Sequence, residues 1–473
     1  MGASYDVIVI GAGPAGEVAS ARTAEYGLTT VVVEAELAGG ECSYWGCMPS
    51  KALLRPSEAL HAAKRVRGAR EAITGEVDAA KVLELRDAFV SHNDDKYQVQ
   101  WIEDHGVTFM RGFARLDGER KVIVENEGSQ TELEANKAVI VATGSSAAIP
   151  PIPGLRDIKV WDNRGVTQAA AIPNSLVVIG GGVIGAEMAQ AMKRLGSETV
   201  VVYEAMDRLL ANMEPFVGAD VLAAFEDEGI EVHLGEAVAE VSREGDDGPV
   251  TVKTDSSETV ADEILVATGR RASTGNLGLD TVGLEPGRFI DVDDTMTVTG
   301  ADNDWLYAIG DVNGRNLFTH MGKYHAIWAA DKIAGKTGPD HESWADHHAV
   351  PAVAFTDPQA GQVGLTAAAA REQGINVREV SYDTGGVAGA SLHGEDAVGT
   401  SLLVIDDDRQ VIVGATMTGH DVGEMLHAAT IAVVSGIEVR KLIHAVPAFP
   451  TMSEVWLRLL EEHERQMRAE GRV

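Results

Sequence analysis

The chain has 473 residues, more than one hydrophobic core usually organises, so we expect two to four domains. Hydrophobic residues make up 45% of the chain and charged residues 23%, as in globular proteins, and the formal net charge of −33 argues against nucleic acid or an anionic membrane as partners. No apolar run has the length of a membrane-spanning helix, and no signal-peptide pattern precedes the strand-like sequence at Tyr5. We therefore expect a cytoplasmic protein.

The first 34 residues follow a dinucleotide-binding pattern of strand, glycine-rich loop, helix, strand and acidic residue. Residues 5–10 and 30–33 predict buried strands, and the second strand ends in Glu34, which is placed to bind ribose hydroxyls. In such a loop the first glycine makes the tight turn, the second lets a pyrophosphate approach the helix N-terminus, and the third allows close helix–strand packing. These glycines are Gly11, Gly13 and Gly16.

The only two cysteines of the chain, Cys42 and Cys47, lie within six residues. Five residues of a regular helix rise about 7.5 Å, so a disulfide requires a distorted segment, which Gly46 permits. Pro49 suits the first turn of a following helix, so Cys47 is expected at a helix N-terminus, where the dipole favours a thiolate. We predict a strained, reversible disulfide. The alternatives are two buried thiols or half of a metal site, but a metal needs further Cys or His ligands that are not nearby.

The next hundred residues predict a helical excursion followed by a return to strands. Residues 55–105 are mixed in charge with few Gly or Pro, which favours helices, and a short β-meander is expected from Gly112 to about residue 135. A buried strand from Lys137 ends in a turn of small residues at 142–144. Three prolines, Pro150, Pro151 and Pro153, then indicate a domain boundary.

The dinucleotide pattern then recurs. Residues 176–179 and 199–203 predict strands, the second of which ends in Glu204, and residues 267–269 close this unit as residues 142–144 closed the first. The glycines of the second loop are Gly180, Gly182 and Gly185. Two such modules imply two nucleotides, with electron transfer between them.

Beyond the second module the chain is expected to return to the first, because residues 305–311 read as a strand that feeds a glycine turn with one acid, Asp311. Residues after about 346 alternate as antiparallel strands, with helices near 422–435 and 453–467, and predict an α+β domain. The fold class is therefore α/β, with two Rossmann-like domains and a C-terminal α+β domain. The expected divisions are 1–150, 151–270, 271–345 and 346–473.

These motifs, in this order, resemble the FAD-dependent pyridine nucleotide–disulfide oxidoreductases, which include dihydrolipoamide dehydrogenase, glutathione reductase and mercuric reductase. The resemblance covers essentially the whole chain. It implies FAD on the first module (1–150 and 271–345), a nicotinamide cofactor on the second, and a C-terminal dimerisation domain that makes a homodimer. The motifs that carry it are the two glycine loops, the Gly40 to Lys51 stretch with both cysteines, Thr143-Gly144, Glu187, Thr268-Gly269-Arg270 and Gly310-Asp311.

The resemblance also implies roles for single residues. Cys47 is expected beside the flavin, and Cys42 is expected to be the interchange thiol that meets substrate. Lys51 and Glu187 would pair near the flavin N5, where a lysine stabilises developing negative charge. Further residues expected along the cofactors are Ala114, Thr143, Gly144, Ser145, Gly269, Asp311, Leu317, Phe318, Thr319 and His320. Glu204 favours NADH over NADPH, because a carboxylate accepts from the ribose 2′-OH and repels a 2′-phosphate.

The sequence departs from the family at its C-terminal His-Pro-Thr-x-Ser-Glu stretch, whose histidine is the acid–base catalyst of thiol–disulfide interchange. Here Phe449 takes the place of the histidine, and the glutamate is kept as Glu454. Phenylalanine moves no proton and desolvates a neighbouring thiol. Mercuric reductases also lack this histidine, and 2-ketopropyl-coenzyme M carboxylase has a phenylalanine there, although its neighbouring glutamate is replaced.

The sequence is therefore compatible with three functions. The first is an NADH-dependent flavoenzyme that reduces a small-molecule disulfide or related acceptor through Cys42 and Cys47 without the usual histidine. The second is direct transfer from flavin to a quinone or metal ion, or a carboxylase-like reductive reaction at carbon. The third, least favoured because both glycine loops and both cysteines are intact, is an inactive flavin scaffold. No resident metal is expected.

Overall fold

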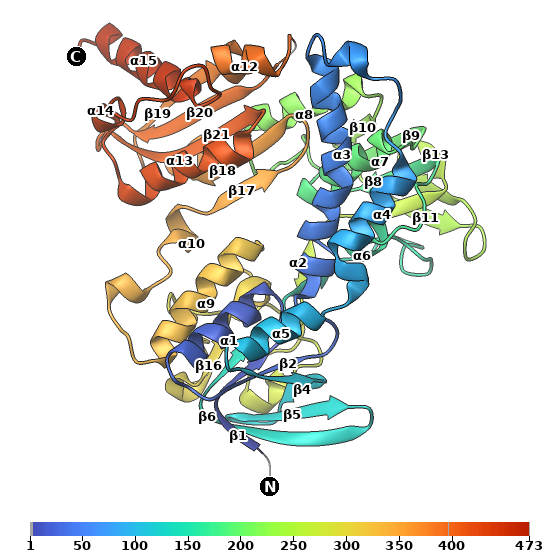
Figure 1. Cartoon of the computed structure of the whole chain (residues 1–473), viewed down its shortest axis with the longest axis vertical. Helices are drawn as coiled ribbons and strands as arrows, with labels where there is room; N and C mark the ends of the chain where they lie inside the picture. The colour runs from blue at the N-terminus through green and yellow to red at the C-terminus, as the bar shows by residue number, and fades with distance from the viewer. Residues whose placement is uncertain (1–2, 396, 473) are drawn as a thin grey trace. The chain divides into compact units, whose positions relative to one another are not determined.

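The computed structural model describes residues 3–395 and 397–472, which form two compact units. The first comprises the described parts of Met1–Pro49 with Arg86–Ala148 and Gly269–Asp346. The second comprises Ser50–Leu85 and Ile149–Thr268 with the described parts of His347–Val473. Each unit therefore collects segments that are far apart in the sequence (Figure 1).

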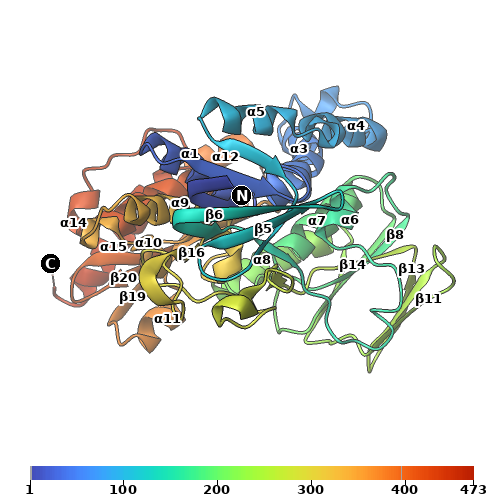
Figure 2. The ribbon, with the colours of Figure 1, turned by 90° about the horizontal axis from the view of Figure 1, so that it is seen from below.

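The first unit is built on a seven-stranded sheet in the order β3-β2-β1-β6-β5-β4, with β16 also paired to β6. Its strands are β1 (Ala3–Ile10), β2 (Thr30–Glu34), β3 (Thr108–Arg111), β4 (Phe113–Leu116), β5 (Lys121–Asn126), β6 (Ser129–Val141) and β16 (Leu306–Ala308). Strands β1, β2, β3, β16 and the second half of β6 form the parallel part, whereas β4, β5 and the first half of β6 form an antiparallel meander. Figure 2 shows β5 running beside the long β6.

Helices cover this parallel sheet because its strands are apolar on both faces. Ile8 and Ile10 point into one core cluster, and the alternate residues Val7 and Val9 point into a second on the opposite face. Three helices lie side by side on one face (Figure 1): α1 (Pro14–Glu25), α5 (Lys96–Asp104) and α9 (Thr319–Ile333). Strand β16 pairs in parallel with β6, so residues 306–308 join the sheet of the first unit.

The second unit holds the other dinucleotide module, whose parallel sheet has the order β10-β9-β8-β14. Its strands and helices are β8 (Ser175–Ile179), α7 (Val183–Arg194), β9 (Thr199–Glu204), α8 (Pro215–Asp227), β10 (Glu231–Leu234) and β14 (Glu263–Val266). Leu176 and Val178 face one cluster and Val177 and Ile179 face the other, so this sheet is also buried on both sides. A three-stranded antiparallel sheet, β11 (Glu240–Arg243), β12 (Val250–Lys253) and β13 (Glu258–Ala261), adjoins it.

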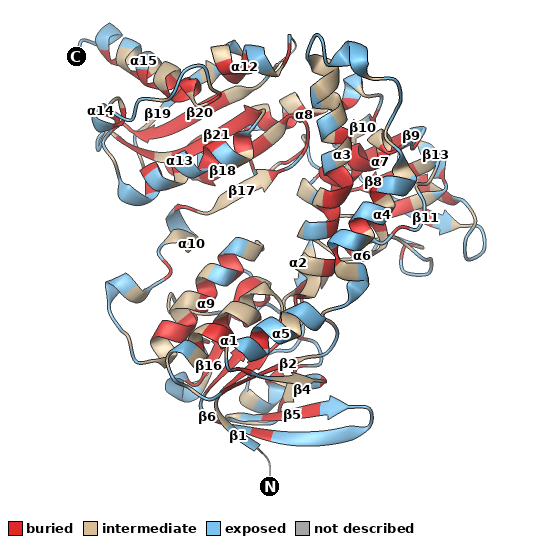
Figure 3. Ribbon diagram, in the orientation of Figure 1, coloured by how far each residue is buried: buried red, intermediate tan, exposed pale blue. Residues whose placement is uncertain are grey.

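The same unit contains the predicted C-terminal α+β fold. A five-stranded antiparallel sheet has the order β17-β18-β21-β20-β19, and Figure 3 shows its central strands largely buried. The strands are β17 (Pro351–Ala354), β18 (Gln359–Gly364), β19 (Val377–Asp383), β20 (Thr400–Asp406) and β21 (Val411–Gly419). Its helices are α11 (Ala367–Glu372), α12 (Ala388–His393), α13 (Val422–Ser435), α14 (Val439–Leu442) and α15 (Glu454–Ala469).

The remaining elements include helices of the expected excursion and several shorter elements. They are α2 (Gly40–Tyr44), α3 (Cys47–Arg65), α4 (Ala79–Phe89), α6 (Asn163–Thr167), α10 (Ala345–His348) and a two-stranded pair of β7 (Ser145–Ala147) with β15 (Arg270–Ala272). Among the described residues, no helix combines the length and apolar character needed to cross a membrane.

Candidate active site

The glycines of the first loop are required by close backbone approach. Gly11 has a φ of +101°, and a Cβ on it would lie 2.5 Å from the Ala142 carbonyl oxygen. A Cβ on Gly16 would lie 1.9 Å from the Gly11 carbonyl oxygen. The loop is held further by Glu34, whose Oε2 accepts a hydrogen bond from the Ala12 backbone N–H at 2.7 Å. Burial is the main cause that raises the pKa of this Glu34 carboxyl.

This loop also fits the pyrophosphate of a dinucleotide. A Cβ on Gly13, the N-cap of α1, would meet nothing within 4 Å, so this backbone faces open space at a helix N-terminus. The Thr143 hydroxyl is buried and has no hydrogen-bond partner among the described residues. A phosphate or ribose oxygen at this place would satisfy that hydroxyl. The open helix end and the orphaned hydroxyl therefore match FAD.

The second loop repeats this geometry in the other unit. Gly180 has a φ of +106°, and its Cβ would lie 2.5 Å from the Ala267 carbonyl oxygen. A Cβ on Gly185 would lie 1.9 Å from the Gly180 carbonyl oxygen, whereas one on Gly182 would meet nothing within 4 Å. Glu204 ends β9 and accepts hydrogen bonds from the backbone N–H groups of Gly181 and Met206. The second loop thus fits a second dinucleotide.

The two cysteines lie where one helix ends and the next begins. Cys42 is in α2, which ends at Tyr44, and Cys47 is the first residue of α3, as the sequence predicted. Glycine suits the break between these two helices because a side chain would not fit, and not because of an unusual φ. A Cβ on Gly46 would lie only 3.1 Å from the Glu41 carbonyl oxygen. The two sulfur atoms are not joined by a disulfide in this structure.

The two thiols have different surroundings. The Cys47 Sγ lies 3.4 Å from Oγ1 of Thr319, the first residue of α9. The pKa of the Cys42 thiol is raised, first by its hydrogen bond to Cys47 and then by burial and by negative charge on Cys47. This direction describes a pair in which Cys47 carries the thiolate and Cys42 keeps the proton. The helix N-terminus at Cys47 favours the same distribution.

A polar cluster that the sequence motifs did not connect surrounds Asp311. Ser145 Oγ donates to Asp311 Oδ2 at 2.5 Å, and Arg270 Nε donates to the same Ser145 oxygen at 2.6 Å. Arg270 also lies 3.6 Å from Asp311. The pairing of β7 with β15 brings these residues together across about 125 positions of sequence. Arg270 belongs to the Thr268-Gly269-Arg270 motif, but no signal in the sequence predicts its contact with Ser145 and Asp311.

A buried histidine, also missed from the sequence, fixes the turn before Asp311. His325 Nδ1 accepts the Gly310 backbone N–H at 3.2 Å, and its Nε2 lies 2.8 Å from Asp346 Oδ1. Both side chains are almost fully buried. The arrangement assigns the ring proton to Nε2, which it donates to Asp346.

Lys51 and Glu187 form an ion pair of 2.7 Å within the second unit. Glu187 is 2% exposed, and its second oxygen accepts the Phe355 backbone N–H at 2.9 Å. The Lys51 ammonium also lies 4.8 Å from the centroid of the Phe355 ring. Glu187 is thus a buried carboxylate with two donors, one of which is the Lys51 ammonium, and it holds the lysine charge in place. The contact with Phe355 was not predicted.

The remaining predicted cofactor residues occupy ordinary local positions. Phe318 is the N-cap of α9 and its ring stacks on His320 at 5.3 Å, while Leu317 before it is exposed. Ala114 is buried in β4. Gly144 and Gly269 both have positive φ, and a Cβ on either would meet nothing within 4 Å. Their roles toward a cofactor stay predictions.

The structure shows how Phe449 and Glu454 are placed in the C-terminal stretch where the usual histidine is missing. Phe449 is 74% exposed in the single chain. Glu454 at the start of α15 is 4% exposed, and its carboxylate pairs with Arg458 at 2.6 Å and accepts the Ala388 backbone N–H at 3.2 Å. Glu454 is therefore satisfied within its own domain and needs no histidine partner.

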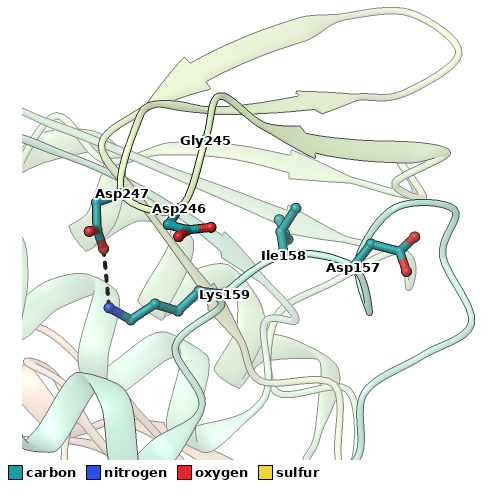
Figure 4. Close-up of a pocket in the computed structure, with 6 residues that line it drawn as sticks. All are labelled: Asp157, Ile158, Lys159, Gly245, Asp246 and Asp247. Carbon is teal, nitrogen blue, oxygen red and sulfur yellow. Dashed lines mark hydrogen bonds and ion pairs between the residues drawn. The ribbon is translucent and has the colours of Figure 1, made fainter.

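Among the described residues, no group of His, Cys, Asp and Glu could hold a metal ion. A depression in the second unit is lined by residues 157–159 and 245–247, where Lys159 lies 3.2 Å from Asp247 (Figure 4). It contains none of the predicted site residues, and four of its six lining residues are charged.

Comparison with known proteins agrees with this geometry. The family model for pyridine nucleotide-disulphide oxidoreductases matches residues 5–332, and that for the dimerisation domain of the same oxidoreductases matches residues 350–459. Dihydrolipoyl dehydrogenase of Chlamydia muridarum is 32% identical over 461 residues, which cover 96% of each chain. Mercuric reductase of Staphylococcus aureus is 29% identical over 454 residues, covering 95% of this chain and 81% of the relative.

Solved structures show the same fold. The Cu(II) complex of RclA, an HOCl-induced flavoprotein disulfide reductase from Escherichia coli, superposes with a TM-score of 0.84 at 23% identity, over 97% of this chain and 99% of that one. The two glycine loops, the cysteine pair and the C-terminal antiparallel domain all follow the order of the matched family. The chain belongs to the pyridine nucleotide-disulphide oxidoreductases, a family of FAD-dependent enzymes that act on sulfur groups and bind FAD and NAD(P)H.

Proposed function

We propose that this protein is an NADH-dependent disulfide oxidoreductase of the dihydrolipoyl dehydrogenase type, in which electrons reach Cys42 and Cys47 and then a small disulfide acceptor. The observation that carries the proposal is the unequal thiol pair, with Cys47 at the start of α3 and beside Thr319, and Cys42 next to it with a raised pKa. A pair of this kind has one thiol that stores negative charge and one that exchanges with substrate.

The chain's residues divide the work of holding two cofactors. The first glycine loop, Glu34, Thr143 and the Asp311 cluster would hold FAD, and the second loop and Glu204 would hold the nicotinamide cofactor. Bound FAD supplies two-electron transfer between nicotinamide and thiols. The carboxylate of Glu204 sits at the end of β9, where it favours a free ribose 2′-OH, so we propose NADH as the preferred cofactor. Lys51, held by Glu187, is proposed to stabilise negative charge near the flavin.

The interchange step can be balanced from the residues present. The Cys42 thiol loses its proton and its sulfur attacks one sulfur of the acceptor disulfide, which releases one thiolate. The Cys47 thiolate then attacks Cys42, and the second acceptor sulfur leaves. The cysteine pair, which enters as one thiol and one thiolate, is oxidised by two electrons. The acceptor is reduced by the same two electrons and leaves as one thiol, which takes the Cys42 proton, and one thiolate.

Removal of the proton from Cys42 is the step for which Phe449 supplies no catalyst. The phenylalanine carries no proton, and Glu454 is engaged by Arg458 and Ala388. We therefore expect a slower exchange with lipoamide than histidine-bearing enzymes achieve, and an acceptor that is a low-molecular-weight or unusual disulfide. We propose a cytoplasmic location, and the dimerisation domain supports a homodimer.

An anaerobic titration with NADH, followed by visible absorption, tests the proposal. A long-wavelength band of a thiolate against the flavin should appear, and lipoamide or another disulfide should remove it. The Cys47→Ser variant should lack the band. The Cys42→Ser variant should keep flavin and lose disulfide turnover, and turnover that survives this change would refute the route through the thiols.

A second function is favoured by the same Phe449 and by the raised pKa of Cys42. In it, electrons pass directly from the flavin to a quinone or metal ion, or serve a reductive reaction at carbon like that of 2-ketopropyl-coenzyme M carboxylase. Direct transfer predicts that Cys42→Ser keeps full activity with a quinone. The carbon reaction predicts a thioether substrate and dependence on Cys42 without net disulfide reduction.

A further inference from the structure

Asp95, at the start of helix α5, does not cap the helix that it precedes. An aspartate at a helix N-cap usually accepts a hydrogen bond from a backbone N–H in the first turn of its own helix. Within the described residues, the Asp95 side chain makes no such bond. Its Oδ2 instead accepts the backbone N–H of Ala38 at 2.7 Å, across 57 positions of sequence. This contact joins the start of α5 to the segment that leads into α2 and Cys42.

A strained turn comes shortly before Asp95. Ser91, His92 and Asn93 have φ values of +51°, +53° and +60°, a left-handed conformation that residues with a side chain rarely adopt, least of all in succession. Strain of this kind persists where the surrounding structure fixes it, and it clusters at functional sites. The turn lies between α4 and α5, so it sets the place from which the Asp95 carboxylate reaches Ala38.

Arg111, the last residue of β3, holds the same carboxylate. Its Nη2 donates to Asp95 Oδ2 at 2.5 Å, and its Nη1 donates to the Glu36 carbonyl oxygen. Arg111 lies directly beside Glu34 in the pairing of β2 with β3. The Asp95 side chain is 14% exposed, so water has little access to these bonds. The loop that follows Glu34 is therefore held at Glu36 by Arg111 and at Ala38 by Asp95.

The contact at Ala38 fixes the start of the cysteine helix on the first glycine loop. The next residue, Gly39, donates its N–H to the carbonyl oxygen of Ala12, a residue of that loop, at 2.7 Å. Helix α2 then begins so close to the loop that a Cβ on its first residue would lie 2.9 Å from a backbone atom there. Cys42 lies in this helix, and its place relative to Cys47 depends on the attachment.

We propose that Asp95 is a positioning residue for Cys42. Its carboxylate oxygen, through the Ala38 N–H, holds α2 so that the Cys42 sulfur is placed to meet the Cys47 sulfur. This inference rests on the proposed exchange through the two cysteines. A disulfide forms only within a narrow geometry, so a fixed α2 favours the disulfide over the dithiol. What α2 receives from Asp95 is a hydrogen-bond acceptor, so an uncharged acceptor at the same place should serve as well.

An anaerobic redox equilibrium with glutathione tests this inference without NADH or turnover. Two molecules of glutathione reduce the disulfide between Cys42 and Cys47 to the dithiol and leave as glutathione disulfide. The flavin-bearing protein is equilibrated at a series of glutathione ratios, quenched with acid and alkylated, and the two forms are counted by mass spectrometry. Asp95→Ala removes the acceptor and should move the equilibrium roughly tenfold toward the dithiol, equivalent to about 30 mV for a two-electron couple.

Two milder variants separate the acceptor from the charge and keep the test valid if Asp95→Ala does not fold. Asp95→Asn loses the charge but keeps an oxygen for the Ala38 N–H, so its equilibrium should stay within about twofold of the unaltered protein. Asp95→Glu keeps the charge but carries its oxygens away from Ala38, so it should shift as Asp95→Ala does. Asp94→Ala is the matched control, because Asp94 also accepts a backbone N–H and pairs with an ammonium, both of the nearby Lys96.

Flavin content and the thermal unfolding midpoint are measured for every variant. A loss of stability alone would lower the midpoint and leave the redox equilibrium where it is. An unchanged equilibrium in Asp95→Glu, or an equal shift in Asp95→Asn or Asp94→Ala, would overturn the proposal while the route through the thiols stands. If the unaltered protein forms no disulfide at any glutathione ratio, the route itself is refuted, and this inference falls with it.

Discussion

Gly182 offers a clean test of how the second glycine loop works, because it is required by a ligand rather than by the protein. Its backbone at the N-cap of α7 has φ −72° and ψ −175°, which alanine adopts without strain. A Cβ there would meet no protein atom within 4 Å, whereas a Cβ on Gly185 in the same loop would lie 1.9 Å from the Gly180 carbonyl oxygen. Gly182→Ala should therefore leave the fold intact and place a methyl group where we propose that the pyrophosphate of NADH approaches.

The size of the effect follows from the contacts that the methyl would displace. A hydrogen bond from a backbone N–H to a charged oxygen contributes about 1.5–3 kcal/mol, so the loss of one such bond should weaken NADH binding roughly ten- to a hundredfold. The cost to folding should stay near 1 kcal/mol or less, since alanine is only a poorer N-cap than glycine. Binding and stability thus change by clearly different amounts.

Binding is measured by anaerobic titration of flavin absorption with NADH, together with flavin content and the thermal unfolding midpoint. Gly75→Ala is the matched control, because Gly75 is exposed and its Cβ would also meet nothing. The reciprocal variant Gly13→Ala should lower flavin content while NADH fluorescence titration stays normal. If Gly182→Ala binds NADH within about twofold of the unaltered protein, the nucleotide does not approach this backbone and the reasoning is refuted.

Three further outcomes are expected. Gly16→Ala should yield protein without flavin, since the new Cβ would lie 1.9 Å from the Gly11 carbonyl oxygen; a normal ratio of absorption at 450 nm to 280 nm would contradict this. Glu204→Gln should reduce the preference for NADH over NADPH by about tenfold in kcat/KM, the equivalent of roughly 1.4 kcal/mol, and an unaltered preference would show that specificity lies elsewhere. Thr319→Val should raise the pKa of the Cys42 thiol, because the hydrogen bond from Thr319 that lowers it is lost; a thiolate absorbance at 240 nm that titrates as before would exclude this contribution.

The sequence predicted those parts of the fold and site that depend on local sterics. Gly16 and Gly185 could be recognised because a helix packs so closely on a strand that no side chain fits, and this requirement has a fixed spacing. The start of α3 at Cys47 could also be predicted from local residues, because Gly46 precedes it and Pro49 lies in the first turn of the helix. Such signals lie within a few residues of the feature that they specify.

Contacts between distant segments could not be predicted in this way. The Ser145 hydroxyl joins Asp311 and Arg270 through strand pairing between β7 and β15, and no spacing in the sequence announces that pairing. His325 and Asp346 are buried together only because the chain folds back after α9. The ion pair of Lys51 with Glu187 was predicted from family resemblance, but the Phe355 contacts that fix it depend on the tertiary fold.

The surroundings of Phe449 and Lys323 bear on how an exchange enzyme can work without a histidine. A histidine lost from a buried pair would leave Glu454 as an uncompensated charge, which costs several kcal/mol. Here Arg458 and the Ala388 N–H satisfy that carboxylate, so phenylalanine is compatible with a stable domain rather than a mark of decay. A histidine lowers the barrier to exchange by taking the thiol proton, whereas a nearby cation lowers it by stabilising the thiolate. Lys323 belongs to the second kind, because its positive charge lowers the pKa of the Cys42 thiol.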